Sequence, residues 1–553
     1  MNQSFIALVE KSIKEHWNLN ALTDYKGATL QYKDVARKIE KLHILFEQSG
    51  VEKGDRIAIC GRNSAQWGAA FLAILTYGAV AVPILHEFKA ENIHYIVNHA
   101  DAKLLLVGDM VWPELDEKEM PKLEGIIMLN DYALLVSRTE KLSYAREHLN
   151  EMFGKKYPKN FRIEHIKYEY DEPEQLALIN YTSGTTSLSK GVMIPYRALW
   201  SNTEFAFEVL TLKPGDKLVS MLPMAHMYGM AFEFLYEFCT GCHIFYLTRV
   251  PSPKIIFEAF AEVKPNIVVA VPLIIEKIIK KNVLPKLQTP AMQILLRVPI
   301  INDKIKATVR EQMIQAFGGK FYEVIVGGAA FNQDVERFLK MIDFPYTVGY
   351  GMTECAPIIC YEDWHKFVPG SCGKAAPRMQ VKIDSPDPQH IVGEIMCKGM
   401  NVMLGYYKNE EATRQVLEPD GWLHTGDLGV IDKDGNVFIK GRSKNMLLGP
   451  SGQNIYPEEI EEKLNNLPYV NESIVIQKGD KLVALVYPDF EEAEAQGIVG
   501  DEAIAKAMEQ NRQTLNSQIP GYCQISRVKI FHEEFEKTPK RSIKRFLYKD
   551  AAD

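Results

Sequence analysis

The sequence lacks any stretch that is long and apolar enough to cross a membrane. Residues 69–85 carry no charge, but Gly78 and Pro83 interrupt them, and they fall short of the roughly 20 residues that a spanning helix needs. Residues 1–18 mix charged side chains into their apolar positions and contain no secretory hydrophobic region. We therefore expect a cytoplasmic protein with no transmembrane segment.

A surplus of positive charge is also missing. The net charge is -7 over 553 residues, and 46% hydrophobic with 24% charged residues is an ordinary globular composition. Such a chain has no general attraction to nucleic acid or anionic lipid, so a polyanion must be bound at a local site. We expect no nucleic-acid partner. A basic cluster in residues 537–549 leaves peripheral contact with a membrane surface open.

The eight cysteines lack the paired spacing of a zinc site. Cys239 and Cys242 form an isolated Cys-x-x-Cys followed by His243, without a second ligand pair at a suitable spacing. A cytoplasmic setting favours reduced thiols. The pattern instead predicts a helix that ends at Gly241, before a strand over residues 243–247.

A P-loop is absent as well, although one polar loop suits a polyanion. Residues 181–191 read Tyr-Thr-Ser-Gly-Thr-Thr-Ser-Leu-Ser-Lys-Gly, which has neither the spacing of a P-loop nor a helix after it. Apolar runs at 176–179 and 192–194 predict a strand on either side. The tip offers hydroxyl donors, Gly184 and the mobile charge of Lys190, all suited to phosphate oxygens. A polar hairpin with an incidental lysine is the alternative.

Helix and strand patterns alternate along the first part of the chain. Residues 28–50 place apolar side chains on a helical period that ends at Gly50, and residues 56–60 predict a buried strand. The alternation continues through residues 69–76, 79–83, 92–100 and 103–107. It predicts an α/β fold with parallel-rich sheets flanked by helices, and the length predicts at least two domains. Residues 109–173 are richer in charge, and we interpret them as a possible surface insertion.

The polar loop resembles the phosphate-binding signature of the adenylate-forming enzymes, the superfamily of acyl-CoA synthetases, peptide-synthetase adenylation domains and firefly-type luciferases. That signature commonly reads Tyr-Thr-Ser-Gly-Thr-Thr-Gly-x-Pro-Lys-Gly-Val, and this chain departs from it at Ser187, Ser189 and Tyr196. Within the superfamily the chain looks most like the long-chain fatty acid:CoA ligases. The resemblance implies that ATP is bound by Thr182, Ser183, Gly184, Thr185, Thr186 and Lys190, with Thr185 also at the metal.

Two further segments carry the resemblance. Residues 347–354 read Thr-Val-Gly-Tyr-Gly-Met-Thr-Glu, and their last six positions match the family pattern. An aromatic ring between glycines can meet a purine face, and Glu354 is a hard oxygen ligand suited to magnesium. Residues 421–427 end in Asp427, whose carboxylate the resemblance assigns to the ribose hydroxyls. The resemblance also implies a catalytic Glu354 and nucleotide contacts from Gly328, Ala329, Ala330, Gly349, Tyr350, Gly351, Met352, Thr353 and Arg442.

Two apolar stretches bear on the acid substrate. His226, within residues 222–229, stands where the family places a residue that borders the acyl and thiol pocket, although a lone histidine is more often structural. Residues 267–275 predict a buried strand and turn leading into a helix from Glu276, and they are similar to the pocket wall of several acyl ligases. Their aliphatic character fits a fatty acid, although core packing explains it equally well.

The resemblance also implies a division of the chain. It places a hinge at Lys444, between an N-terminal domain of residues 1–443 that binds ATP and acid and a small, mobile α+β lid of residues 444–553. In the lid, residues 458–465 predict a helix with Pro457 at its first position.

The end of the chain departs most clearly from the family. The family usually reads Thr-Pro-x-Gly-Lys there, and its lysine acts in adenylation, but by direct register Ser542 stands at that position here. Lys540 and Lys544 share a face with Ser542 if the segment is extended. We hypothesise that one of these lysines substitutes, with Lys544 preferred. The alternative is that neither does, and that adenylation is slow.

The resemblance therefore predicts an ATP-dependent acid:CoA ligase that uses ATP, Mg²⁺ and, as co-substrate, CoA. Its substrate is a small carboxylic acid, for which we favour a medium- or long-chain fatty acid. An aryl acid, or transfer to a carrier protein instead of CoA, remains open, and a luciferase is conceivable. The alternative from another class is a noncatalytic sensor of nucleotide or acyl-adenylate, in which Ser542 would indicate lost activity.

Overall fold

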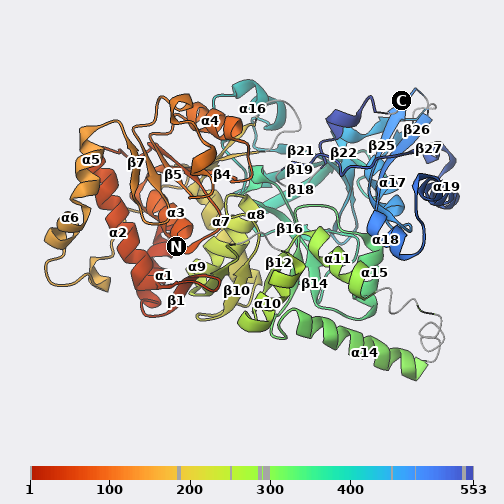
Figure 1. Ribbon diagram of the computed structural model, residues 1–553, viewed down its shortest axis with the longest axis horizontal. Coiled ribbons are helices and arrows are strands. Elements are labelled where there is room, and N and C mark those ends of the chain that lie inside the picture. Colours follow the sequence, from red (N-terminus) through yellow and green to blue (C-terminus); the bar gives the residue numbers. More distant parts are fainter. Residues whose placement is uncertain are drawn as a thin grey trace. The chain divides into compact units, whose positions relative to one another are not determined.

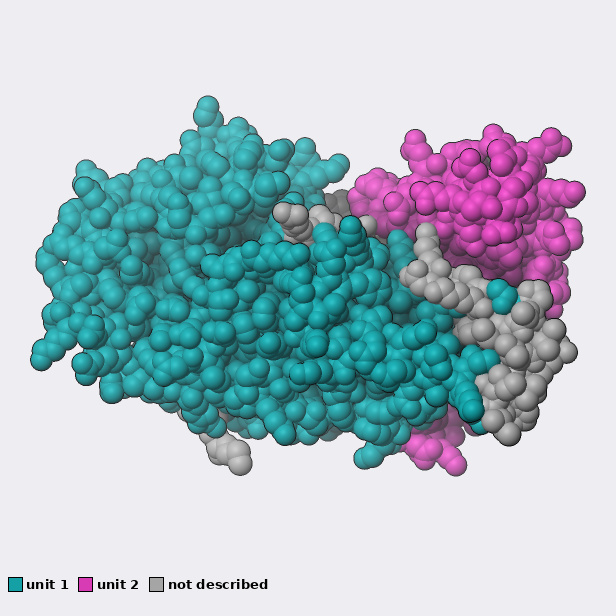
Figure 2. Space-filling view, turned by 60° about the horizontal axis from the view of Figure 1, so that its bottom comes forward, with its two compact units in different colours: residues 1–182, 189–380, 398–423 teal, residues 183–188, 381–397, 424–553 magenta. Residues whose placement is uncertain are grey.

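The computed structural model describes residues 3–182, 189–248, 252–283, 289, 299–449, 453–479, 481–538 and 543–551 (Figure 1). These residues form two compact units (Figure 2). The larger unit runs to residue 182 and adds residues 189–380 and 398–423, and the smaller unit holds residues 381–397 and 424–553. The expected α/β class, with a large N-terminal and a small C-terminal part, is confirmed. The hinge at Lys444 stays a prediction.

An eight-stranded sheet lies in the larger unit, in the order β20-β9-β8-β4-β3-β5-β6-β7. Its strands are β3 (Arg56–Cys60), β4 (Val80–Ile84), β5 (Leu104–Val107), β6 (Gly125–Met128), β7 (Leu134–Ser137), β8 (Leu176–Tyr181), β9 (Gly191–Pro195) and β20 (Gly405–Tyr406). The five from β8 to β6 run parallel, whereas β7, β9 and β20 are antiparallel to their neighbours. Strands β6 and β7 come from residues 109–173, so that segment extends the sheet.

Helices of the larger unit follow the strands in sequence, as the alternation predicted. They include α1 (Phe5–Glu15), α2 (Tyr32–Ser49), α3 (Ala65–Tyr77), α4 (Ala90–His99), α5 (Glu140–Glu147), α6 (Leu149–Lys156) and α7 (Tyr196–Val209). Helix α2 ends at Gly50, whose φ of 83° is the left-handed conformation expected there. Its predicted start was wrong, because residues before Tyr32 form strand β2 (Thr29–Gln31), which pairs with β1 (Asn20–Asp24).

Three smaller sheets complete the larger unit. Their orders are β10-β11-β1-β2, β12-β13-β14 and β15-β16-β17, with β10 (Lys217–Ser220), β11 (His243–Tyr246), β12 (Val268–Ala270), β13 (Val324–Val326), β14 (Tyr346–Val348), β15 (Tyr350–Gly351), β16 (Ile358–Tyr361) and β17 (Lys374–Ala375). Among its described residues, the larger unit also has the helices α8 (Met227–Met230), the π-helical η4 (Ala231–Leu235), α9 (Tyr236–Thr240), α10 (Pro253–Val263), α11 (Pro272–Asn282), α14 (Pro299–Ala316), α15 (Gln333–Met341) and α16 (Glu410–Val416), and the 3₁₀ turns η1 (Trp112–Glu114), η2 (Glu117–Glu119), η3 (Ile163–His165) and η5 (Thr353–Cys355).

Two helix boundaries in this region can be compared with the predictions from the sequence. Helix α9 ends at the left-handed Gly241 before β11, as predicted. Helix α11 begins at Pro272, four residues before the predicted start at Glu276. Proline loses nothing at the first helical position, because the N–H that it lacks would have had no partner inside the helix.

The smaller unit is built from antiparallel and mixed sheets with helices. Its strands are ordered β18-β19-β21-β22, β23-β24 and β25-β26-β27: β18 (Met379–Asp384), β19 (Gly393–Gly399), β21 (Leu423–Ile431), β22 (Val437–Arg442), β23 (Leu447–Leu448), β24 (Asn454–Ile455), β25 (Val470–Lys478), β26 (Lys481–Pro488) and β27 (Ile525–Ile530). Its helices are α17 (Pro457–Leu464), α18 (Phe490–Ala495) and α19 (Asp501–Gln518), with short turns η6 (Ser443–Asn445), η7 (Gly521–Cys523) and η8 (Arg545–Tyr548). An apolar core of its own joins α17 and α19 to the last sheet. Among the described helices of the chain, none is both apolar and long enough to span a membrane.

Candidate active site

The base of the polar loop is an antiparallel ladder. Strands β8 and β9 pair up to Tyr181 and Gly191, and the N–H of Thr182 donates to the carbonyl oxygen of Lys190 at 3.0 Å. This ladder fixes where the loop starts and ends. Thr182 and Lys190 lie at its base. The other predicted phosphate contacts lie outside the described residues: Ser183, Gly184, Thr185 and Thr186.

Two predicted site residues, Lys190 and Glu354, contact the same side chain. The ammonium nitrogen of Lys190 lies 4.9 Å from the ring centroid of Tyr406, within the range of a cation–π interaction. The hydroxyl of Tyr406 donates to Glu354 Oε1 at 2.9 Å. Tyr406 belongs to β20, which pairs with β9 next to Lys190. The fold thus brings the loop lysine and the predicted metal ligand together.

The Glu354 carboxylate keeps one oxygen available. Tyr406 donates to Oε1, and no residue in the described ranges is hydrogen-bonded to Oε2. Within those ranges no three His, Cys, Asp or Glu side chains are grouped to hold a metal ion. Mg²⁺ usually takes one or two carboxylates and completes its shell with water and substrate phosphates. One carboxylate beside a phosphate loop therefore fits a magnesium ion that arrives with ATP.

The predicted adenine turns follow two neighbouring parallel strands. Strand β13 leads into Gly328, Ala329 and Ala330, which are exposed, and β14 leads into Gly349. The Gly349 N–H donates to the carbonyl oxygen of Val326 at 2.9 Å, so the two turns stay adjacent. Open α/β sheets bind ligands outside the carboxyl ends of their strands, which is where these turns lie.

The turn that carries Glu354 is packed tightly against the following chain. A side chain at Gly351 would clash with the carbonyl oxygen of Pro357, and the Met352 N–H donates to that oxygen at 2.9 Å. Tyr350 and Thr353 are buried, with 6% and 5% of their surfaces exposed. Glycine at position 351 is therefore needed for the backbone to approach closely and hold the 3₁₀ turn of Glu354 in place.

His226 is half-buried at the start of α8, close in space to the phosphate-loop strand. The side-chain amide of Asn180, on β8, donates to the carbonyl oxygen of Ala225 at 2.8 Å, which fixes the preceding turn. The N–H of Tyr228 donates to His226 Nδ1 at 3.2 Å. A neutral His226 therefore carries its proton on Nε2.

Glu233, which no sequence motif indicates, positions the same turn. It is fully buried on η4, and its Oε2 accepts from the N–H groups of Met221 at 3.0 Å and Leu222 at 2.8 Å and from the Ser220 hydroxyl at 3.1 Å. Burial raises the pKa of Glu233 well above its ordinary value. A buried acid with three donors on one oxygen anchors the chain that leads to His226.

Tyr228 contacts the end of β13. Its hydroxyl lies 3.2 Å from the Ile325 carbonyl oxygen and 3.4 Å from that of Ala270. A Cβ atom on Gly327 would be 3.0 Å from the Tyr228 ring, so a side chain there would push the ring out of its place by a few tenths of an ångström. An aromatic wall thus lies beside the turn of Gly328.

The smaller unit holds the predicted ribose ligands as neighbours. Asp427 on β21 pairs with Arg442 on β22, and Arg442 Nε lies 3.3 Å from Asp427 Oδ1. The Arg442 side chain is 58% exposed and that of Asp427 only 11%, so the carboxylate is held and the guanidinium is accessible. Glu394, which the sequence reading missed, fixes the turn by accepting from the Gly426 N–H at 2.9 Å.

The two lid predictions lie at defined positions in the smaller unit. Lys444 stands in η6, where the neighbouring Asn445 donates to Glu458 on α17 at 2.6 Å. Lys544 forms an ion pair with Glu536, and its N–H donates to the Glu536 carbonyl oxygen at 2.8 Å. Lys540 and Ser542 lie outside the described residues, so the choice between the lysines stays a prediction.

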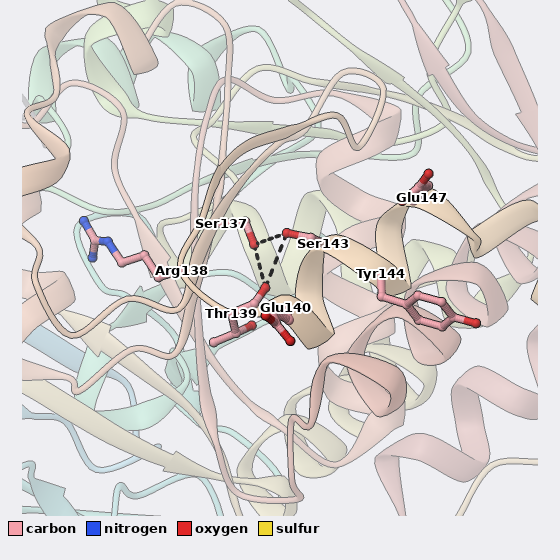
Figure 3. A pocket seen from close by; sticks show the side chains of 7 residues that line it. All are labelled: Ser137, Arg138, Thr139, Glu140, Ser143, Tyr144 and Glu147. Carbon is pink, nitrogen blue, oxygen red and sulfur yellow. Dashed lines mark hydrogen bonds between the residues drawn. The ribbon is translucent and has the colours of Figure 1, made fainter.

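A surface depression of the larger unit lies far along the chain from these segments. It is lined by Ser137, Arg138, Thr139, Glu140, Ser143, Tyr144 and Glu147 (Figure 3). Ser143 donates to Ser137 at 2.8 Å, and Arg138 donates to backbone carbonyl oxygens, including that of Met120 at 2.7 Å. These polar groups hold the start of α5 and its neighbouring loop in place.

The Cys-x-x-Cys pair is buried. Burial raises the pKa of Cys239 and of Cys242 above the ordinary value for a thiol, which makes both poor nucleophiles. Their role in the structure is in the packing of α9 and the turn to β11.

Comparison with known proteins identifies a family for the N-terminal and the C-terminal segments of the chain. The family described as "AMP-binding enzyme" matches residues 9–407, and its separate C-terminal domain matches residues 445–551. Long-chain-fatty-acid–CoA ligase ACSBG2 of Rattus norvegicus is 27% identical over 481 residues, which cover 82% of this chain and 70% of that protein. A long-chain-fatty-acid–CoA ligase of Escherichia coli is 25% identical over 581 residues, covering 100% of this chain and 94% of its own. The vertebrate relatives are longer, and this chain spans 66–70% of them.

Solved structures share the fold. ATP-bound MatB from Rhodopseudomonas palustris aligns with a TM-score of 0.78 at 22% identity, covering 100% of both chains. The anthranilate CoA ligase AuaEII in complex with anthranoyl-AMP aligns with a TM-score of 0.79 at 20% identity, covering 100% of this chain and 97% of the other.

Proposed function

Because this chain belongs to the AMP-binding enzyme family, we propose that it is an ATP-dependent acid:CoA ligase. The observation that carries the proposal is the joint contact of Lys190 and Glu354 with Tyr406 at the base of the phosphate loop. Lys190 supplies a cation for phosphate oxygens, and Glu354 supplies a carboxylate for a metal ion at the same place. Within the smaller unit, the Asp427–Arg442 pair holds a carboxylate that suits ribose hydroxyls.

The reaction has two steps, and each step has its own leaving group. A carboxylate oxygen of the acid attacks the α-phosphorus of ATP, and pyrophosphate leaves to give the acyl-adenylate. The CoA thiolate then attacks the acyl carbon, and AMP leaves to give the thioester. Lys190 is proposed to hold phosphate oxygens in the first step, and Lys544 or Lys540 to stand in for the lysine that is missing at Ser542.

Magnesium fits this site through Glu354, with Thr185 as a second ligand implied by the resemblance. When bound with ATP, the ion would neutralise phosphate charge and favour departure of pyrophosphate. Glu354 would bind the magnesium ion through Oε2, because the Tyr406 hydroxyl donates to Oε1. In the described part of the chain the Lys544 ammonium group is held by an ion pair whose partners are 28% and 54% exposed, so releasing it from that pair costs at most about 1 kcal/mol.

For the acid we propose a medium- or long-chain fatty acid. Support comes from the names of the fatty-acid relatives and from the aliphatic character of β12 and α11. An aryl acid is the second candidate, because the ring of Tyr228 lies beside the Gly328 turn and 6.4 Å from Phe232 in an edge-to-face pair. An aromatic acid packs well against such edges.

One assay tests the function. Pyrophosphate release is measured with ATP, magnesium and a panel of fatty and aryl acids, each with and without CoA. Release together with thioester formation supports the ligase, and the preferred acid identifies the substrate class. Release without thioester would instead favour transfer to a carrier protein. No release with any acid overturns the ligase and favours a nucleotide sensor.

A further inference from the structure

The backbone of Tyr406 is held beside β9, the strand that follows Lys190. Strand β20 pairs with β9, with Tyr406 opposite Val192. The Tyr406 N–H donates to Thr413 Oγ1 at 2.9 Å, which ties β20 to α16. The preceding Gly405 has φ of 142°, and a Cβ there would lie 2.8 Å from the Thr413 methyl group. These contacts hold the backbone from which the Tyr406 side chain extends.

The Tyr406 side chain interacts with two opposite charges at once. Its ring accepts the Lys190 ammonium, and its hydroxyl donates to Glu354. The side chain is buried, with 7% of its residue surface exposed.

The two charges do not pair with each other. In the described part of the chain no ion pair joins Lys190 to Glu354, although both contact one aromatic side chain. A lysine and a carboxylate that contact the same side chain in a partly buried site attract each other more strongly than they would in water, because the local dielectric is lower. A rigid ring that binds both can prevent their direct contact.

We propose that Tyr406 is a positioning residue that keeps Lys190 and Glu354 apart, so that one is available to phosphate oxygens and the other to the metal ion. This proposal rests on the proposed ATP site and adds a residue to it. Without the ring, Lys190 and Glu354 would form a salt bridge, and each would have to break it before ATP and magnesium could bind. The hydroxyl has a separate effect, because it orients the carboxylate through Oε1.

The two halves of the side chain can be tested separately. Tyr406→Phe retains the ring and removes only the hydroxyl. It should leave metal-free ATP binding within about twofold and raise the magnesium concentration needed for half-maximal pyrophosphate release by about threefold to tenfold. Tyr406→Leu removes the ring, and it should weaken ATP binding measured calorimetrically in EDTA by about tenfold.

A double substitution distinguishes charge separation from a purely structural role. In Glu354→Gln the lysine has no carboxylate to pair with, so adding Tyr406→Leu should change metal-free ATP affinity by less than about twofold. If the ring only supports the fold, the loss caused by Tyr406→Leu is the same in both backgrounds, and the proposal is overturned. Melting temperatures of the apo proteins check that every variant is folded.

The neighbouring tyrosine provides the matched control. Tyr407 lies on the same segment, but its ring contacts His99, 5.8 Å away between centroids, and the Lys408 ammonium at 5.2 Å. Tyr407→Leu should leave metal-free ATP affinity unchanged. These binding measurements need neither acid nor CoA, so they remain decisive if the acid panel yields no thioester. If the wild-type protein does not bind ATP, this inference is overturned along with the nucleotide site.

Discussion

Arg545 anchors the end of the chain to α17, and its removal should have a measurable effect. Its Nη1 donates to Glu461 Oε1 at 2.7 Å, its Nη2 donates to Oε2, and the Val475 N–H also donates to Oε1 at 2.6 Å. Glu461 is 6% exposed. Burial raises the pKa of Glu461, and Arg545 opposes that rise. Arg545→Ala therefore leaves a buried carboxylate without its cation.

Loss of one partner from a buried pair costs about 3 to 5 kcal/mol. We expect the lower end here, about 3 kcal/mol, because 24% of the Arg545 side chain is exposed. Hydrogen exchange of the α17 and β25 amides measures this loss of stability directly. A loss of about 3 kcal/mol corresponds to about 100-fold faster exchange. The control is Glu509→Ala, which removes an exposed pair with Arg512 and should cost less than about 1 kcal/mol.

The loss should depend on pH in a defined direction. Without Arg545, the folded-state pKa of Glu461 rises further above its unfolded value, so the folded state binds more protons than the unfolded state. Stability then falls as pH rises from the unfolded pKa through the folded one. The deficit of Arg545→Ala should thus be smaller near about pH 5 than near about pH 8. An equal deficit at both, or one no larger than that of the control, would refute the reasoning.

Three further predictions concern the site. Asp427→Ala should raise the KM for ATP by about tenfold or more in steady-state assays, since a charged hydrogen-bond acceptor is lost, and an unchanged KM would contradict the ribose role. Pyrophosphate exchange should fall strongly in Lys544→Ala or Lys540→Ala, and undiminished exchange in both would rule out substitution for Ser542. Gly351→Ala should lower the melting temperature, with about 1 to 3 kcal/mol of stability lost to the clash at Pro357, and a fully stable variant would show that the turn adapts.

The sequence was most informative where function depends on adjacent residues. The strands before and after the phosphate loop and the order of βα units follow from apolar runs buried on both faces of a sheet. The first turn of α2 was misassigned, because residues 29–31 pair with a strand that the local pattern does not reveal. Residues 109–173 have weak periodicity, yet β6 pairs with β5, since a charged edge segment can still contribute short buried strands.

No local sequence pattern indicates the residues that support the site or those that hold the end of the chain. The physical reason is the same in both cases. Tyr406 and Glu354 are 52 positions apart, and Arg545 and Glu461 are 84 apart, so no local spacing marks either pair. Signature residues such as Lys190 are defined by the ligand that they bind, and they recur in a short motif. The role that we propose for Tyr406 depends on two residues distant from it in the sequence, and a tyrosine in a short strand is more simply interpreted as part of the core. The role that we propose for it becomes visible only when β20 brings its side chain into contact with both a lysine and a carboxylate, between which the described part of the chain shows no ion pair.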